Sequence, residues 1–230
     1  MSDLLIVIPA YNEADNIEKV VRHLTEVCPD YDYIVVNDGS QDDTAEICRR
    51  NHFHLLDLPV NLGLAGGFQA GLRYAEKHGY RYAIQIDGDG QHRPEFIESM
   101  RKKMDEGYDI VIGSRFVDAE KPRTMRMFGS NLIELAIRLT TGMRIKDPTS
   151  GMRLFNRKMI CEFAKGLNYG PEPDTVSYLI RCGARVAEVP VVMDERQGGV
   201  SYLTPIRSAR YMFRMLVSIL LIQSFRRRKV

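Results

Sequence analysis

The sequence predicts an α/β protein in which a mostly parallel central sheet is flanked by helices. Short runs of β-branched and aliphatic residues alternate with longer segments that carry apolar residues at helical spacing, a pattern typical of βαβ units. Polar turns follow several of the expected strands, and parallel sheets bind ligands beyond the carboxyl ends of their strands. A chain of 230 residues can bury one substantial core. We therefore expect one domain over residues 1–204, followed at 205–230 by an apolar helix with a basic tail.

The expected elements follow from apolar periodicity and turn residues, in chain order. Strands are expected at Leu4–Ile8, Tyr33–Asn37, His54–Leu58, Ala83–Asp87, Ile110–Ser114 and Ala184–Val189. Helices are expected at Ala14–Val27, Thr44–Arg50, Ala65–His78, Pro94–Glu106 and Leu132–Thr140, within Pro171–Cys182, and from Pro205 to Phe225. Residues 115–130 are basic and are expected to form a loop.

Composition excludes several classes of protein. Hydrophobic residues make up 44% of the chain and charged residues 27%, as in ordinary globular proteins. A net charge of +2 gives no indication of nucleic-acid binding. The four cysteines show no CxxC spacing, so neither a zinc site nor a disulfide framework is predicted, and a reducing, cytoplasmic compartment is expected. No apolar stretch reaches the roughly 18–20 residues that span a bilayer.

The segment Ile84–Pro94 carries the strongest functional signal. An apolar run leads into Asp87-Gly88-Asp89-Gly90-Gln91, and residues at i and i+2 of an extended backbone point the same way. Two convergent carboxylates repel each other unless a cation lies between them, and their hard oxygen atoms suit Mg²⁺ or Mn²⁺. The pattern predicts the metal–diphosphate centre of a transferase, although such tripeptides also form ordinary turns. GxGxxG and GxxxxGK[ST] are both absent, which argues against dinucleotide and P-loop enzymes.

Two earlier polar turns also lie directly after an expected strand. Tyr11 and Glu13 follow the first expected strand, and Asp38 follows the second. Each turn either begins a helix, where acidic residues favour the dipole, or contacts a nucleotide. The two interpretations are compatible, because a capped helix start also fixes the loop in front of it.

Five motifs occur in a fixed order along the chain. They are Pro-Ala-Tyr-Asn-Glu, Asn-Asp-Gly-Ser-x-Asp-x-Thr, Asp-Gly-Asp-Gly-Gln-His-x-Pro, Gly-Ser-Arg and Asp-Pro-Thr-Ser-Gly-Met-Arg. Together, over residues 4–200, they resemble the polyprenyl-phosphate (dolichyl-phosphate) mannose and glucose synthases. This resemblance implies a GT-A fold and the inverting transfer of a hexose from a UDP-hexose or GDP-mannose to undecaprenyl or dolichyl phosphate.

The resemblance also implies roles for single residues. Nucleotide and diphosphate contacts fall on Pro9, Tyr11, Glu13, Asp38, Asp87, Gly88 and Asp89, and the metal ligands on Asp87, Asp89 and Gln91. Arg115, Arg126 and Ser130 match the positions that hold the acceptor phosphate. Tyr202 stands where a lysine is expected, so Arg196 or Arg207 is expected to supply that cation. Asn37 stands where many relatives have aspartate.

The expected chemistry fits these residue types. A phosphate nucleophile is already anionic and needs no strong base, but it needs a cationic pocket to approach a second anion. The guanidinium fork of arginine suits phosphate oxygens. Asp89 and Arg115 are therefore the expected catalytic residues, together with Asp174 if a base is required.

Three alternatives remain open from sequence. A glycosyltransferase of the same fold that acts on a hydroxyl of a polysaccharide would need a base such as Asp174; Glu172 and Asp174 equally suit a helix N-terminal turn. A nucleotidyltransferase lacks its usual glycine-rich, basic first turn. A non-catalytic, nucleotide-sugar-binding partner of a membrane protein would not require the acidic ligands.

The C-terminal segment predicts contact with a membrane or with another chain. Arg207, Arg210, Arg214 and Ser218 form a polar stripe at helical spacing, while the remaining positions are apolar nearly all round. A helix lying in the membrane interface and ending in Arg226-Arg-Arg-Lys229 fits this pattern best. A dimer interface or a membrane-embedded subunit fits nearly as well. We therefore expect a peripheral protein at the cytoplasmic face of a membrane, without a nucleic-acid partner.

Overall fold

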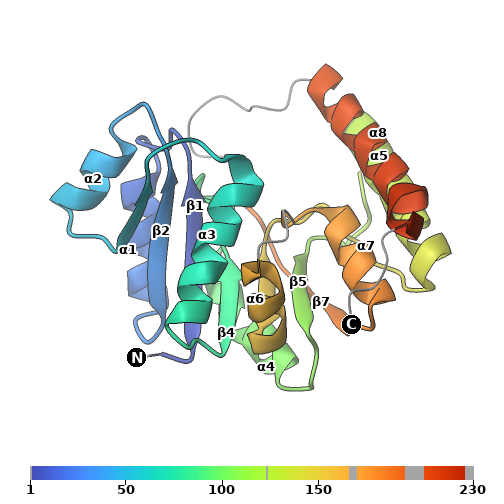
Figure 1. Ribbon diagram of the computed structural model, residues 1–230, viewed down its shortest axis with the longest axis horizontal. Helices are drawn as coiled ribbons and strands as arrows, with labels where there is room; N and C mark the ends of the chain where they lie inside the picture. The colour runs from blue at the N-terminus through green and yellow to red at the C-terminus, as the bar shows by residue number, and fades with distance from the viewer. Residues whose placement is uncertain (1, 123, 166–169, 195–204, 226–230) are drawn as a thin grey trace.

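The computed structural model describes residues 2–122, 124–165, 170–194 and 205–225 (Figure 1). Within these ranges, the side chains of Arg126, residues 205–207 and residues 224–225 are not described. The strands are β1 (Leu4–Ala10), β2 (Asp32–Asp38), β3 (Leu55–Leu58), β4 (Tyr82–Gln85), β5 (Ile110–Ser114), β6 (Arg153–Asn156) and β7 (Val186–Pro190). The helices are α1 (Ile17–Val27), α2 (Thr44–Arg50), α3 (Gly63–Lys77), α4 (Ile97–Met104), α5 (Met125–Thr141), α6 (Arg157–Ala164), α7 (Pro173–Arg181) and α8 (Pro205–Leu220), with 3₁₀ turns η1 (Pro94–Phe96) and η2 (Ile222–Phe225).

The strands described here form one sheet in the order β3-β2-β1-β4-β6-β5-β7. All neighbours are parallel except those of β6, which runs antiparallel to both β4 and β5. The predicted α/β class with a mostly parallel sheet is confirmed. The antiparallel strand matters for the site, because its first residue lies at the carboxyl edge of the parallel strands.

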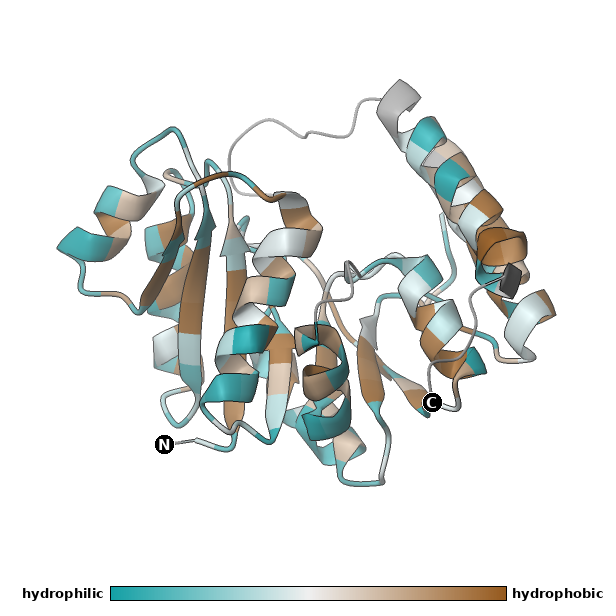
Figure 2. Ribbon diagram, in the orientation of Figure 1, coloured by the Kyte–Doolittle hydropathy of each residue, from teal (hydrophilic) through white to brown (hydrophobic). Residues whose placement is uncertain are grey.

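Helices cover both faces of the sheet, as Figure 1 shows. Successive residues of β1 point to opposite faces, so that Leu5 and Val7 pack on one side and Leu4, Ile6 and Ile8 on the other. The first core contains buried residues of α3, α5, α6, α7 and α8, and the second contains buried residues of α1, α2 and α4. Figure 2 shows the resulting concentration of hydrophobic residues in the strands.

Several predicted boundaries are wrong. β6 and α6 were not predicted, because β6 has four residues and two of them are polar. The expected loop at 115–130 gives way to α5 at Met125, where Thr124 Oγ1 accepts a hydrogen bond from Met127 N–H at 3.3 Å. β4 ends at Gln85 rather than Asp87, and α1 begins at Ile17. The last α-helix ends at Leu220 and continues only as the 3₁₀ turn η2.

α5 and α8 pack along each other at the end of the sheet opposite α1 and α2 (Figure 1). Gly129 allows this approach, because a Cβ atom there would lie 2.9 Å from Met212 Cγ. Among the described residues, neither of these helices nor any other is both long enough and apolar enough to cross a bilayer.

The contact between α3 and β1 predicts a sharp difference between two glycines. A Cβ atom at Gly71 would lie 2.2 Å from Val7 Cγ1, whereas one at Gly67 would make only an ordinary 3.6 Å contact with Asp38 Cβ. We expect Gly71→Ala to destabilise the protein by about 1–3 kcal/mol through overpacking. Gly67→Ala, the matched control, should be neutral or stabilising by up to about 1 kcal/mol because alanine favours helix. Thermal unfolding measures both, and equal melting temperatures would contradict the close contact.

Candidate active site

Three polar turns meet at the carboxyl edge of β1, β2 and β4. In the parallel ladders, Ala10 of β1 lies opposite Asn37 of β2, and Val7 of β1 lies opposite Gln85 of β4. The turns that leave these strands therefore emerge side by side. This arrangement confirms the expectation that the polar turns gather at one edge of the sheet.

The turn after β1 is tied to the start of α2. Pro9 and Tyr11 are half-buried, whereas Glu13 is buried. The backbone N–H of Glu13 donates to Thr44 Oγ1 at 2.9 Å. The side chain of Glu13 accepts, at Oε2, a hydrogen bond from Asn16 Nδ2 at 2.8 Å. Local structure thus fixes the Glu13 carboxylate, and its nucleotide-contacting role stays a prediction.

Asp38 is buried at the end of β2 and organises the start of α3. Its Oδ1 accepts a hydrogen bond from the Leu62 N–H at 2.7 Å, and a Cβ atom at Gly67 of α3 would make an ordinary 3.6 Å contact with Asp38 Cβ. Asn37, the departure from the common aspartate, donates from Nδ2 to Asp57 Oδ1 at 2.6 Å. The Asn37 amide therefore donates a hydrogen bond to the Asp57 carboxylate, which an aspartate at position 37 could do only if it were protonated.

Asp87 is held by its neighbours rather than by an extended backbone. Because β4 ends at Gln85, Asp87 lies outside the strand and Asp89 lies on a turn, so the extended backbone expected here is absent. The convergence of the two carboxylates stays a prediction. Asp87 N–H donates to His92 Nδ1 at 3.0 Å, which places the proton of a neutral imidazole on Nε2, 3.8 Å from Asp87 Oδ2. Gln85 Nε2 donates to Asp87 Oδ1 at 2.8 Å. Sequence reasoning assigned no role to His92 or Gln85.

Two glycines allow other loops to approach this turn. A Cβ atom at Gly151 would lie 2.8 Å from Asp87 Oδ2 and 3.0 Å from His92 Cε1. A Cβ atom at Gly88 would lie 3.2 Å from the Pro9 carbonyl oxygen. The loop before β6 and the turn after β1 therefore both abut the Asp87 turn.

Asp89 and Gln91 link this turn to the segment after β7. Asp89 Oδ1 accepts a hydrogen bond from Gln91 N–H at 3.1 Å. Gln91 Nε2 donates to the Asp194 carbonyl at 3.3 Å, and Arg93 Nε donates to Asp194 Oδ1 at 2.8 Å. The Gln91 amide nitrogen is thus engaged with backbone, and its place among the metal ligands remains a prediction.

The donor set fits a hard cation that shares its coordination with a ligand. Among the residues described, no three His, Cys, Asp or Glu side chains gather as a metal cluster. Asp87 and Asp89 offer carboxylate oxygens, and the Asp87 side chain is 38% exposed. Mg²⁺ is usually bound by one or two carboxylates together with phosphate oxygens. The turn therefore suits Mg²⁺ or Mn²⁺ bound with a diphosphate, and not a site built by the protein alone.

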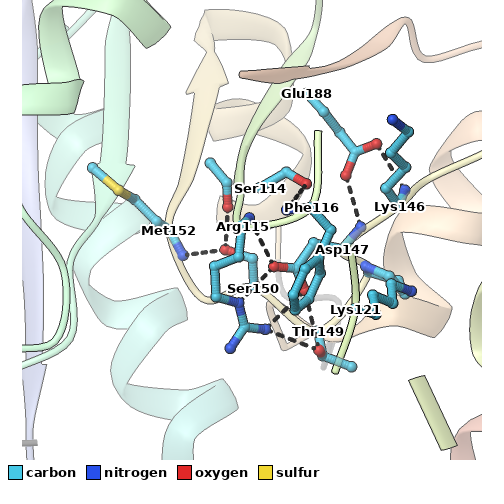
Figure 3. A network of polar contacts seen from close by, with 12 residues as sticks. Ser114, Arg115, Phe116, Lys121, Lys146, Asp147, Thr149, Ser150, Met152 and Glu188 are labelled. Carbon is cyan, nitrogen blue, oxygen red and sulfur yellow. Dashed lines mark hydrogen bonds and ion pairs between the residues drawn. The ribbon is translucent and has the colours of Figure 1, made fainter. Parts of the chain in front are cut away.

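Arg115 forms a fork-to-fork ion pair with Asp147 (Figure 3). Its Nε donates to Asp147 Oδ2 at 2.7 Å and its Nη2 to Asp147 Oδ1 at 2.8 Å. Asp147 is fully buried and also accepts the Arg115 N–H at 3.1 Å. A pair of this geometry is among the stronger polar contacts in proteins. The protein itself therefore supplies an anion to the arginine that was expected to hold the acceptor phosphate.

The loop that carries Asp147 is fixed from several sides, as Figure 3 shows. The N–H groups of Lys146 and Asp147 donate to the two carboxylate oxygens of Glu188 at 2.7 and 2.8 Å. Ser150 Oγ donates to the Gly113 carbonyl of β5 at 2.5 Å. These contacts clamp the loop between β5 and β7.

The other predicted acceptor residues lie on α5 and α8. Arg126 and Ser130 belong to α5, and Arg207 to α8. Ser130 is buried, and its hydroxyl has no hydrogen-bond partner among the residues described. The side chains of Arg126 and Arg207, and all of Arg196 and Tyr202, lie outside the described residues. Their roles stay predictions.

Glu172 and Asp174 join the start of α7 to α8. Asp174 is 9% exposed, and its Oδ2 accepts a hydrogen bond from Ser218 Oγ at 2.6 Å. Glu172 Oε1 accepts one from Arg214 Nη2 at 2.8 Å. Burial raises the pKa of Glu172, and the Arg214 cation opposes this shift. Both carboxylates thus serve the packing of α8, and the predicted base role of Asp174 is untested.

Arg153 is a buried cation that sequence reasoning did not single out. It is 1% exposed in β6, and it donates from Nε to the Ser150 carbonyl at 2.9 Å and from Nη2 to the Pro148 carbonyl at 2.7 Å. Burial lowers its pKa, while Tyr211 and Asp147 oppose this shift. An arginine inside the apolar run Met152–Phe155 was the available signal.

The sequence comparison assigns the chain to a known family. The profile described as Glycosyl transferase family 2 matches residues 5–163. The chain belongs to glycosyl transferase family 2. Its relatives in this family include the polyprenol monophosphomannose synthase of Mycolicibacterium smegmatis, 29% identical over 226 residues that cover 92% of this chain and 84% of that protein. The undecaprenyl-phosphate mannosyltransferase of Micrococcus luteus is 29% identical over 214 residues, 87% of either chain.

A solved structure supports the same assignment at the level of fold. Glucosyl-3-phosphoglycerate synthase from Mycobacterium tuberculosis, in complex with Mn²⁺, UDP-glucose and phosphoglyceric acid, superposes with a TM-score of 0.70. The match covers 98% of this chain and 81% of that chain at 19% sequence identity. The expected GT-A fold and the expected glycosyltransferase family are therefore confirmed.

The Arg115–Asp147 pair yields a prediction on stability. Asp147→Asn keeps the shape of the side chain but removes the buried charge, and we expect a loss of about 1.5–3 kcal/mol, the range for hydrogen bonds to charged groups. Asp118→Asn is the matched control, because it makes the same chemical change at an exposed position of the loop after β5. Urea unfolding of both variants measures the difference. A midpoint for Asp147→Asn equal to that of the control would show that the pair contributes nothing to stability.

Proposed function

We propose that this family 2 glycosyltransferase moves one hexose from a nucleoside-diphosphate sugar to a polyprenyl phosphate. The observation that carries the proposal is that the turns after β1, β2 and β4 leave the same edge of the sheet, where the Asp87 turn also abuts Gly151 of the loop that carries Asp147. The two relatives described above align with most of this chain, and their names support a polyprenyl phosphate as the acceptor.

Asp87 and Asp89 would hold Mg²⁺ or Mn²⁺, with Gln91 assisting. When bound, the cation would act as a Lewis acid that stabilises negative charge on the leaving diphosphate. Pro9, Tyr11, Glu13, Asp38 and Gly88 would surround the nucleotide, since their turns border the same edge of the sheet. The complexes of the M. tuberculosis synthase with Mn²⁺ or Mg²⁺ and UDP support this class of cofactor and donor.

The acceptor phosphate would be held by cations of the loop after β5 and of the helix pair. Arg115 is oriented by Asp147, and its Nη1 makes no hydrogen bond within the described part of the chain. Arg126, Ser130 and Arg207 would complete the pocket. Because phosphate is already anionic, no residue needs to remove a proton, and a single displacement inverts the anomeric carbon. Asp174, whose Oδ2 accepts a hydrogen bond from Ser218 Oγ at 2.6 Å, is then not required as a base.

The α5–α8 pair supports docking on a membrane, where a polyprenyl acceptor resides. Large apolar side chains on this pair, and on the two residues that follow α8, are exposed to solvent, namely Met125 (85%), Phe128 (59%), Leu139 (72%), Phe213 (69%), Leu221 (59%) and Ile222 (52%). Arg210 and Arg214 are exposed on the same helix pair and suit anionic headgroups. We propose a peripheral location at the cytoplasmic face of the membrane.

Transfer should depend on Asp89 and on a divalent cation. Asp89→Ala should reduce transfer to undecaprenyl phosphate by about 100-fold or more, because a metal-dependent leaving group loses several kcal/mol of stabilisation. Asp30→Ala, an exposed acid after α1, is the control. The enzyme is supplied with a panel of UDP-sugars and GDP-mannose as donors, with and without EDTA to remove the metal ion. Mass spectrometry then measures the lipid-linked hexose that forms. Near-normal transfer by Asp89→Ala would refute the metal assignment; donor consumption only with a glycan acceptor would refute the lipid acceptor.

Membrane binding should depend on the exposed apolar side chains. The double variant Met125→Ser/Phe213→Ser should bind vesicles containing phosphatidylglycerol about 10-fold more weakly, given ~25 cal/mol per Å² of apolar surface. Val192→Ser is the control, because Val192 is 54% exposed but lies outside the helix pair. Co-sedimentation measures binding. A wild-type dimer that dissociates in the double variant, without loss of vesicle binding, would assign these side chains to a subunit interface instead.

A further inference from the structure

Gln85 is a polar residue in the hydrophobic core, at the last position of β4. It is 2% exposed, and it lies on the face of the sheet that also buries Ala83 and Phe155. A carboxamide in such a place costs free energy unless its donor and acceptor both find partners. The sequence gives no reason in packing alone for glutamine here, since the neighbouring positions of β4 are apolar or aromatic.

One end of the Gln85 carboxamide is accounted for. Its Nε2 donates to Asp87 Oδ1 at 2.8 Å. Its Oε1 is buried and has no hydrogen-bond partner among the described residues. The donor end therefore fixes a proposed metal ligand, and the acceptor end is directed into the protein.

Arg153 presents the complementary atom on the next strand. In the antiparallel ladder of β4 and β6, Gln85 lies directly opposite Arg153, so both side chains stand on the same face. Nε and Nη2 of Arg153 bind carbonyl groups of the loop before β6, but Nη1 is buried without a partner in the described part of the chain. An acceptor and a cationic donor thus occupy facing positions in the same core.

We propose that Gln85 is a positioning residue that connects Arg153 to Asp87. Arg153 Nη1 and Gln85 Oε1 are not in direct hydrogen-bond contact, and one shared water molecule would connect them by accepting from Arg153 Nη1 and donating to Gln85 Oε1. This polarises the amide, so that Gln85 Nε2 donates more strongly to Asp87 Oδ1. The Asp87 carboxylate is then oriented before a cation arrives. The inference rests on the proposed function, because it requires that Asp87 binds the metal ion.

The proposed connection from Arg153 to Asp87 joins the loop before β6 to the turn after β4. Arg153 holds the carbonyl groups of Pro148 and Ser150, in the loop whose Asp147 pairs with Arg115. Gln85 holds the Asp87 turn. The proposed contact therefore joins the donor side and the acceptor side through the sheet itself.

Mn²⁺ binding tests the role of Gln85 without relying on turnover. Gln85→Met replaces the amide with an apolar side chain of similar length, and we expect the Mn²⁺ dissociation constant, measured by electron paramagnetic resonance with UDP present, to rise about 10-fold or more, as for other residues that hydrogen-bond to metal ligands. Gln69→Met is the matched control, because the Gln69 amide donates to the Phe163 carbonyl at 2.9 Å. It should bind Mn²⁺ within about twofold of the wild type, since its hydrogen bond is remote from Asp87.

A double-mutant cycle tests the connection to Arg153. Arg153→Lys keeps the charge but loses the fork, and it should weaken Mn²⁺ binding in the wild-type background and have little effect in the Gln85→Met background. Additive effects would overturn the connection. If Gln85→Met does not fold, Gln85→Val, which suits a strand, replaces it with the same expectation.

The outcomes separate this inference from the function on which it rests. Equal Mn²⁺ affinity of the wild type and Gln85→Met would overturn the inference and leave the metal-dependent function standing. Absence of Mn²⁺ binding by the folded wild-type chain in the presence of UDP would overturn the proposed function and the inference together.

Discussion

The reversed direction of β6 is the constraint on which the site depends. Because β6 runs against β4 and β5, the loop that precedes it lies at the same edge as the turns that follow the parallel strands. Gly151 can therefore touch the Asp87 carboxylate, and Asp147 can reach Arg115. In a fully parallel sheet, this loop would lie at the opposite edge. One antiparallel strand thus brings residues 147–151 to a site that begins 140 residues earlier, at the turn after β1.

The side chains proposed to border the acceptor are oriented by ion pairs and by hydrogen bonds to buried carboxylates. Arg115 is oriented by the buried Asp147, Glu172 by Arg214, and Asp174 by Ser218. Such pairs restrict side-chain rotamers, and removing one partner is costly, although replacing both partners by apolar residues often changes stability little. Their value here lies in pre-organisation, because an arginine held in one orientation loses less entropy when it binds a phosphate group. The contacts of Glu172 and Asp174 also connect the start of α7 to α8.

The fold class and the family were predictable because they are encoded in local, repeated signals. The alternation of strands and helices and the order of the five motifs can be recognised in the sequence without knowing which residues are in contact. β6 was missed because a strand of four residues that contains Arg153 and Asn156 lacks an apolar pattern. The start of α5 was missed because its basic residues resemble a solvated loop.

The hydrogen bonds of His92, Gln85 and Arg153 depend on turn geometry and on the β4–β6 register, which a single sequence does not specify. The roles of Arg126, Arg207 and the loop at 196–202 remain predictions, because the structure does not describe their side chains.

The close contact of Gly151 with Asp87 has a consequence for how this protein diverges. A side chain at this position would displace the carboxylate, even in a descendant that retains both aspartates of the turn. Gene duplicates that keep Asp-Gly-Asp but replace this glycine are therefore expected to be folded paralogues without transfer activity. If Asp87 binds the metal ion as proposed, we expect a glycine before β6 to accompany the acidic turn in the active members.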